Sequence, residues 1–155
     1  MHRKDEEDFV VAARAYCLFA ESNSDLPLDR RIVLARFLLA DLYAAQLRLP
    51  SVDGLREEAD RCNVAKPANW PSFGTHDVYY EVHNPCEGQQ VVAGLLSEDL
   101  WDVYRSLKSG LIYWDSHREG AARWEWTVEF AVHWGDHLID ALRALHRLSQ
   151  DVAVR

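Results

Sequence analysis

The stretch WEWTVEFAVHWGDHLIDALRALHRL, residues 124–148, decides the fold that this sequence predicts. A helix advances about 100° per residue, and the apolar residues of the stretch recur at helical spacing. They form one wide stripe: Val128, Ala131, Gly135, Leu138, Ile139, Leu142 and Leu145. The opposite side carries ionisable residues flanked by two aromatic rings: Glu129, His133, Asp136, His137 and Asp140, with Trp126 and Phe130. The pattern predicts a long helix with one face in a core and one polar face.

Three more segments show helical periodicity, at residues 6–21, 26–49 and 97–116. Ser97 stands at the start of the third of these and is a suitable N-cap residue, with Glu98 and Asp99 in the first turn. Four main helices with short connections predict an all-α helical bundle. We expect a single helical domain over residues 1–155.

The second and third predicted helices are separated by a long connection, roughly residues 50–95. A short helix is predicted over 52–63, and prolines, glycines and aromatic rings such as Trp70 and Tyr80 follow. Residues 76–83 alternate like a strand, but a lone strand without a partner is not stable. We therefore expect an ordered, aromatic-rich loop packed against the helices.

Composition limits the classes of function. The chain has 155 residues, 48% of them hydrophobic, and a formal net charge of −8. This balance is typical of soluble globular proteins, and the negative charge disfavours nucleic-acid binding. No apolar stretch is long and uncharged enough to span a membrane. Three widely spaced cysteines without a CxxC motif fit a reducing compartment, with Cys17 in the core. We expect a cytoplasmic monomer or small homo-oligomer.

His133 and His137 carry the most specific chemistry in the sequence. At four-residue spacing on a helix, both imidazoles can reach one divalent metal ion such as zinc, iron or manganese. On the same helix, Glu129, Asp136 or Asp140 could add an oxygen ligand. Further ligands could come from the third helix or the loop: Glu98, Asp99, Asp102, His76 and His83. The motif is not HExxH, because Trp134 follows His133. Two other interpretations stay open: a solvated face with His133 paired to Glu129, or histidines hydrogen-bonded to the long loop.

The aromatic residues beside the polar stripe suggest that something covers it. The long loop is the obvious cover. The space beneath it is then either a groove that binds a ligand or a space that the loop fills with its own side chains. The residues predicted to line this groove are Tyr79, Asp99, Asp102, Trp126, Glu129, Phe130, His133, His137 and Asp140.

Four blocks resemble a bacterial family known as domain of unknown function 5063. They are FVVAARAYCLF, DVYYEV, LSEDLWDVYRSLKSGL, and W-x(3)-F-x(2)-HWGDHLIDALRALH. The resemblance implies a small helical cytoplasmic protein without a named activity. Its motif positions here are Asp77, Tyr79, Asp99, Asp102, Tyr104, Trp126, Phe130, His133, Trp134, Gly135 and His137.

Two classes of function remain. The first is a non-enzymatic module that binds a protein or small ligand and needs no cofactor. The alternative is a divalent-metal-dependent, hydrolase-like enzyme that uses His133 and His137. Because the sequence shows no third ligand at a diagnostic spacing, it favours the binding module.

Overall fold

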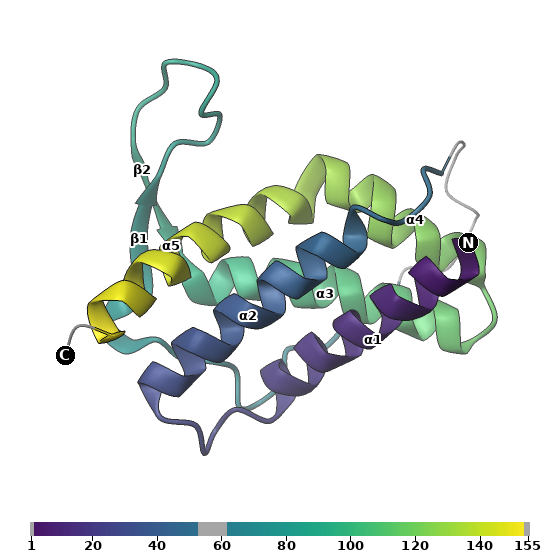
Figure 1. Ribbon diagram of the computed structural model, residues 1–155, viewed down its shortest axis with the longest axis horizontal. Coiled ribbons are helices and arrows are strands. Elements are labelled where there is room, and N and C mark those ends of the chain that lie inside the picture. Colours follow the sequence, from purple (N-terminus) through teal and green to yellow (C-terminus); the bar gives the residue numbers. More distant parts are fainter. Residues whose placement is uncertain (1, 53–61, 154–155) are drawn as a thin grey trace.

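The chain forms a bundle of helices, and the computed structural model describes residues 2–52 and 62–153 (Figure 1). The helices are α1 (His2–Glu21), α2 (Leu28–Gln46), α3 (Leu96–Asp115), α4 (Glu119–Glu129) and α5 (Gly135–Ala153). A π-helical turn, η2 (Phe130–Trp134), joins α4 to α5 without a break. The described residues thus contain four main helical rods, which confirms the predicted all-α bundle. The helix predicted over 52–63 lies almost entirely outside the described residues.

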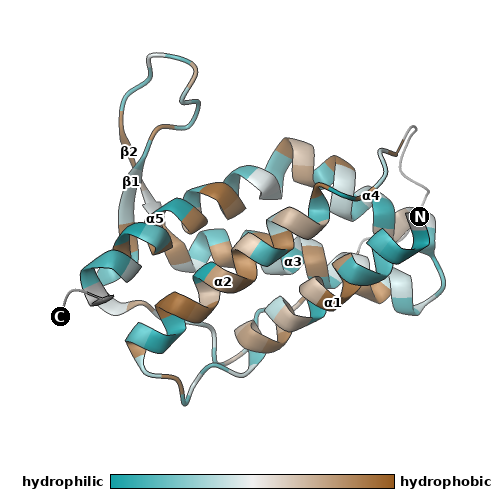
Figure 2. Ribbon diagram, in the orientation of Figure 1, coloured by the Kyte–Doolittle hydropathy of each residue, from teal (hydrophilic) through white to brown (hydrophobic). Residues whose placement is uncertain are grey.

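The four rods enclose one core. α1 packs on α2 and α3, and α5 packs on the other sides of α2 and α3. Hydrophobic residues alternate with hydrophilic ones along each helix, as amphipathic helices require (Figure 2). Fully buried side chains come from every rod, among them Phe9, Tyr16, Leu39, Leu100, Leu107, Trp126, Trp134 and Leu138. None of the helices in the described residues is long and apolar enough to cross a membrane.

Cys17 lies in this core, as predicted. Burial raises the pKa of its thiol to about 12. A thiol that stays protonated is a poor nucleophile, so Cys17 acts as a small packing residue.

The long connection contains a β-hairpin, so the expectation that residues 76–83 have no strand partner was wrong. β1 (Val78–Glu81) pairs in antiparallel fashion with β2 (Val92–Leu95), and Tyr79 stands opposite Gly94. The sequence pattern identified the first strand but no partner, because residues 92–95 are few and directly precede a helix. The tip of the hairpin projects away from the bundle (Figure 1).

Asp77 fixes the base of the hairpin to the start of α3. Its carboxylate accepts hydrogen bonds from the backbone N–H and the hydroxyl of Ser97, both at 2.8 Å. Its carbonyl accepts another from the N–H of Leu96. The helix therefore begins at Leu96, one residue before the predicted cap, and its free N–H groups are satisfied by Asp77 instead of by the Ser97 side chain.

The π turn changes which residues of the last rod face the core. Ala131 and Ile139, predicted to be buried, are exposed, whereas Trp126 and Trp134 are fully buried. A π turn contains more residues than an α turn, so a uniform step of 100° assigns the faces wrongly across it. Two backbone carbonyl groups just before the π turn accept hydrogen bonds from side chains. Trp134 Nε1 donates to the carbonyl of Glu125, and Gln46 Nε2 donates to the carbonyl of Trp126.

Candidate functional site

Carboxylates of α3 meet histidines of the last rod below the base of the hairpin. Asp99 and Asp102 lie one turn apart on α3, where helical spacing puts them on one face. His133 belongs to the π turn and His137 to the first turn of α5. The sequence predicted both pairs separately, and the packing of α3 against α5 brings them together.

His137 lies between the two carboxylates. Its Nδ1 is 2.7 Å from Asp99 Oδ1, a hydrogen bond, and its Nε2 is 3.6 Å from Asp102 Oδ2. His133 Nε2 is 3.8 Å from Asp102 Oδ1. The side chains of both histidines are about one-third exposed, at 33% and 34%, so the cluster stands at the edge of the core and is open to solvent.

Tyr79 of β1 holds Asp99 from the other side. Its hydroxyl donates a hydrogen bond to Asp99 Oδ2, and burial followed by this contact raises the pKa of the phenol. Tyr79 therefore stays protonated and acts as a donor. Gly94 makes this position possible, because a Cβ there would lie 2.7 Å from the Tyr79 ring.

The carboxylates favour the protonated form of His137. The hydrogen bond to Asp99, together with the negative charges of Asp102 and Asp99, raises the pKa of the imidazole. A cation at His137 is thus electrostatically stabilised. A metal ion at Nε2 would supply positive charge at the same place.

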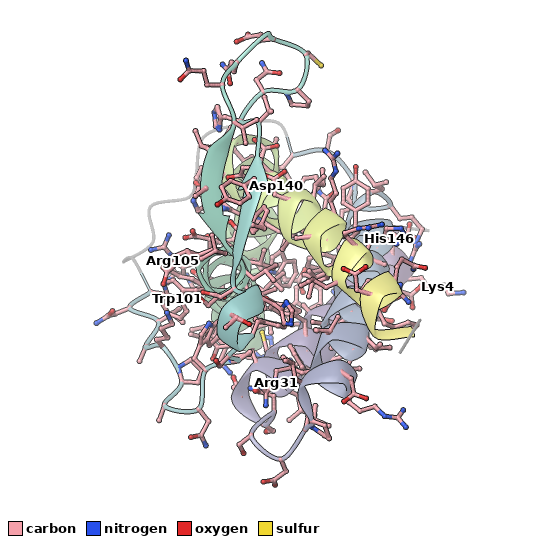
Figure 3. All side chains as sticks on the ribbon, turned by 90° about the vertical axis from the view of Figure 1, so that its left-hand side faces the viewer. Lys4, Arg31, Trp101, Arg105, Asp140 and His146 are labelled. Atoms are coloured by element: carbon pink, nitrogen blue, oxygen red, sulfur yellow. The ribbon has the colours of Figure 1, made fainter. Side chains whose placement is uncertain are left out.

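Asp140 forms a second contact between α5 and the hairpin (Figure 3). Burial raises the pKa of its carboxyl to about 7, and a hydrogen bond to Glu81 and the charges of Glu81, Asp99 and Asp136 act in the same direction. A protonated Asp140 can donate to the Glu81 carboxylate. The two acidic groups then attract each other instead of repelling.

This pairing predicts a pH dependence of stability. Between about pH 4 and 7, Asp140 is protonated in the folded protein but ionised in the unfolded chain. Its contribution to the free energy of unfolding therefore falls as the pH rises through that window. Asp140→Asn keeps a hydrogen-bond donor without the charge. We compare the free energy of unfolding of the variant with that of the wild type. After allowance for solvent screening, this difference should be about 1–2 kcal/mol more in favour of the variant at pH 8 than at pH 5. Urea unfolding at both pH values measures this. Parallel pH profiles would contradict the assignment.

A cavity of about 420 Å³ lies beside the cluster, on the side of His133. Its polar walls come from α3 and the last rod and include Arg105, Ser106, Ser109, Glu129 and His133. Arg105 Nη2 also forms an ion pair with Asp102 at 2.9 Å. The cavity can accommodate a small polar ligand next to the two histidines.

Some of the predicted groove residues lie elsewhere. Trp126 is fully buried against Phe9 and Trp114, and Phe130 packs on Tyr43 and Trp134. Both rings therefore belong to the packing of the bundle and not to a groove beside the histidines. The π turn is the reason, because it rotates this part of the rod relative to His137.

Glu129 lines the cavity but is not grouped with the histidine nitrogens. Within the described residues, the ligand atoms that come together are those of Asp102, His133 and His137, all within 4.8 Å of one another. The carboxylate nearest His133 is thus Asp102 and not Glu129.

Sequence reasoning missed Glu81 and Arg105. Glu81 follows Tyr79 at two-residue strand spacing and shares its face, and Arg105 follows Asp102 at helical i, i+3 spacing. Both spacings were readable, but nothing in the sequence marked these positions as part of a site.

The geometry of the cluster fits a divalent transition metal. Metal–nitrogen bonds of about 2.0–2.1 Å in a tetrahedral site put ligand atoms roughly 3.4 Å apart. The two histidine nitrogens lie 3.6 and 3.8 Å from different oxygens of Asp102, and one ligand atom from each of the three residues lies within 4.8 Å of the others. Asp99 binds Nδ1 of His137, so Nε2 is left for the metal, as in many metal sites where a carboxylate orients the histidine. A metal ion held by these three residues would keep a further coordination position for water or a ligand.

Comparisons with known proteins identify the fold and the family. The solved structure of protein BF1032 from Bacteroides fragilis is similar, with a TM-score of 0.77 and 20% identity; the match covers 94% of this chain and 92% of that one. At this identity the likeness shows a common fold. No curated protein matches the chain. The model of the family called domain of unknown function, DUF5063, matches residues 70–151, which contain the whole cluster. The chain therefore belongs to the DUF5063 family.

Proposed function

We propose that this protein binds one divalent transition metal ion through Asp102, His133 and His137 and uses it in a hydrolase-like reaction on a ligand in the adjacent cavity. The observation that carries the proposal is the convergence of these three ligand atoms from two helices. The sequence favoured a binding module because it showed no third ligand at a diagnostic spacing. The position of Asp102 beside both histidines supports its choice as the third ligand, and for this reason we prefer the metal-dependent function.

The surrounding residues have distinct roles in this proposal. Asp99, held by Tyr79, orients His137 so that Nε2 points to the ion. A metal ion held by these three residues would supply the Lewis acidity that activates water near neutral pH. Glu129 lines the cavity beside His133 and is the candidate to accept the proton of that water.

Arg105 gives the cavity a positive charge close to the ligand position. Its guanidinium is held by Asp102, a proposed metal ligand, so it can also orient that carboxylate. The carboxyl groups of Glu125 and Glu129 also line the cavity, so its wall combines both signs of charge and favours a strongly polar ligand.

Metal content tests the proposal directly. Tag-free protein purified without chelator should contain about one equivalent of zinc, iron or manganese by elemental analysis. His133→Ala with His137→Ala, and separately Asp102→Asn, should lose it. A matched control, His76→Ala with His146→Ala, removes two histidines outside the cluster and should keep the metal.

A hydrolytic activity is tested on the same samples. Metal-loaded protein should cleave p-nitrophenyl esters or phosphates, and the Glu129→Gln variant should lose rate while it retains the ion. A well-folded protein that contains no metal and shows no saturable zinc binding by calorimetry would overturn the proposal. Metal binding without hydrolysis would overturn only the reaction.

A further inference from the structure

A second hollow lies between α2 and α5, away from the histidine cluster. It is a groove of about 640 Å³ with an apolar floor. The floor consists of Val33, Phe37, Ala40, Ile139 and Leu142. Phe37 is 65% exposed and Ile139 44%. A large aromatic side chain this exposed, next to other apolar side chains, is typical of a surface that another molecule covers.

The edges of the groove are basic. It is lined by Arg36, Arg143 and His146, and by no acidic side chain among the residues that the structure describes. Arg36 donates to the Ser149 hydroxyl, and neither arginine forms an ion pair within the described residues. The two arginines thus give the groove a charge opposite in sign to the net charge of −8 of the whole chain. Charge complementarity therefore favours an acidic occupant.

The shape of the groove suits a helix. Val33, Phe37 and Ala40 lie on one face of α2 and extend over about two helical turns, roughly 10 Å. Two packed helices with an apolar seam between them can accept the apolar face of a third, which inserts side chains at positions i and i+4.

We propose that this α2–α5 groove docks an acidic amphipathic helix of a partner protein. Leucine-like anchors of the partner contact Phe37 and Ile139, and its carboxylates face Arg36 and Arg143. The groove is separate from the proposed metal site, because His146 and Arg105 lie on opposite sides of the bundle (Figure 3). This proposal stands or falls independently of the metal.

Designed peptides test both the apolar and the charge component. The probe is a fluorescein-labelled helical peptide of about four turns with leucines at i, i+3, i+4 and i+7 and glutamates on its other face. One comparison peptide has lysine for each glutamate, and another has the same composition with the leucines scattered. In anisotropy titrations the first should bind at least about tenfold more tightly than either comparison.

Variants locate the binding. Phe37→Ser and Arg143→Glu should each weaken binding of the acidic peptide about tenfold or more, and higher salt should weaken it further. Matched controls on α1, Leu18→Ser at a site that is 63% exposed and Lys4→Glu, should leave it unchanged. All four positions are on the surface, so circular dichroism should show an intact fold.

Three results would overturn the proposal. Equal affinity for the lysine peptide would refute the acidic partner. If the Phe37→Ser variant binds the peptide as tightly as the wild type, the peptide binds at a site other than this groove. If the wild-type protein sediments as a dimer that Phe37→Ser converts to monomer, then a second copy of this chain covers the groove.

Discussion

Replacing Trp126 with alanine is expected to destabilise the fold by roughly 3–5 kcal/mol, the cost of removing a large aromatic side chain from a core. The indole is fully buried and packs on Phe9 at 5.0 Å and Trp114 at 5.7 Å between ring centroids. It also covers Gly110, where a Cβ would lie 2.0 Å from the Trp126 nitrogen. Denaturant unfolding monitored by far-UV circular dichroism measures the loss.

A matched control separates burial from aromatic character. Tyr80 is an aromatic residue with 75% exposure, so Tyr80→Ala should change stability by less than about 0.5 kcal/mol. If Trp126 lined a ligand groove instead, its replacement would be tolerated and only ligand binding would suffer. A stable Trp126→Ala protein would therefore contradict its place in the core.

Replacing Arg123 with alanine is expected to cost roughly 2–4 kcal/mol, because it leaves the Glu6 carboxylate buried without its cation. Arg123 Nε and Nη2 lie 2.5 and 3.2 Å from the two Glu6 oxygens. The Glu6 side chain is only 4% exposed. This pair links the start of the first helix to α4. Thermal and urea unfolding of the variant measure its contribution.

Two comparisons isolate the effect of burial. Arg14 and Asp115 form an ion pair at 2.6 Å with both side chains about half exposed, so Arg14→Ala should have an effect near zero. The double variant Glu6→Leu with Arg123→Met removes both charges and should be more stable than Arg123→Ala. Equal losses for Arg123→Ala and Arg14→Ala would show that the Glu6 contact contributes little.

The candidate site combines a regular helix with a π turn. Asp99 and Asp102 stand on a regular helix, whereas His133 belongs to a π turn, an element that is frequent at functional sites. The turn places His133 and His137 with ring centroids 4.9 Å apart while Trp134 between them enters the core. The position of the histidines thus depends on the packing of the bundle, and the two cannot be altered independently.

The sequence predicted the parts of this site better than their assembly. Local spacing was enough to put His133 and His137 on one side of a helix and Asp99 and Asp102 on one side of another. It was not enough to choose between Glu129 and Asp102 as the partner of His133. That choice depends on how α3 packs against the last rod. The spacing of residues within either helix carries no information about this packing.

By itself the sequence determined the helices, the apolar faces of the first three and the chemistry available on them, because these follow from interactions between residues three or four apart. Only the tertiary structure decided that Val92–Leu95 pairs with Val78–Glu81, that Trp126 is buried, and that Asp102 meets the histidines. Two of these contacts are between residues far apart in the chain, namely the strand pairing and the packing of α3 on the last rod. Local spacing does not predict such contacts. The burial of Trp126 depends on the π turn, which changes the helical step that sequence reasoning takes to be constant.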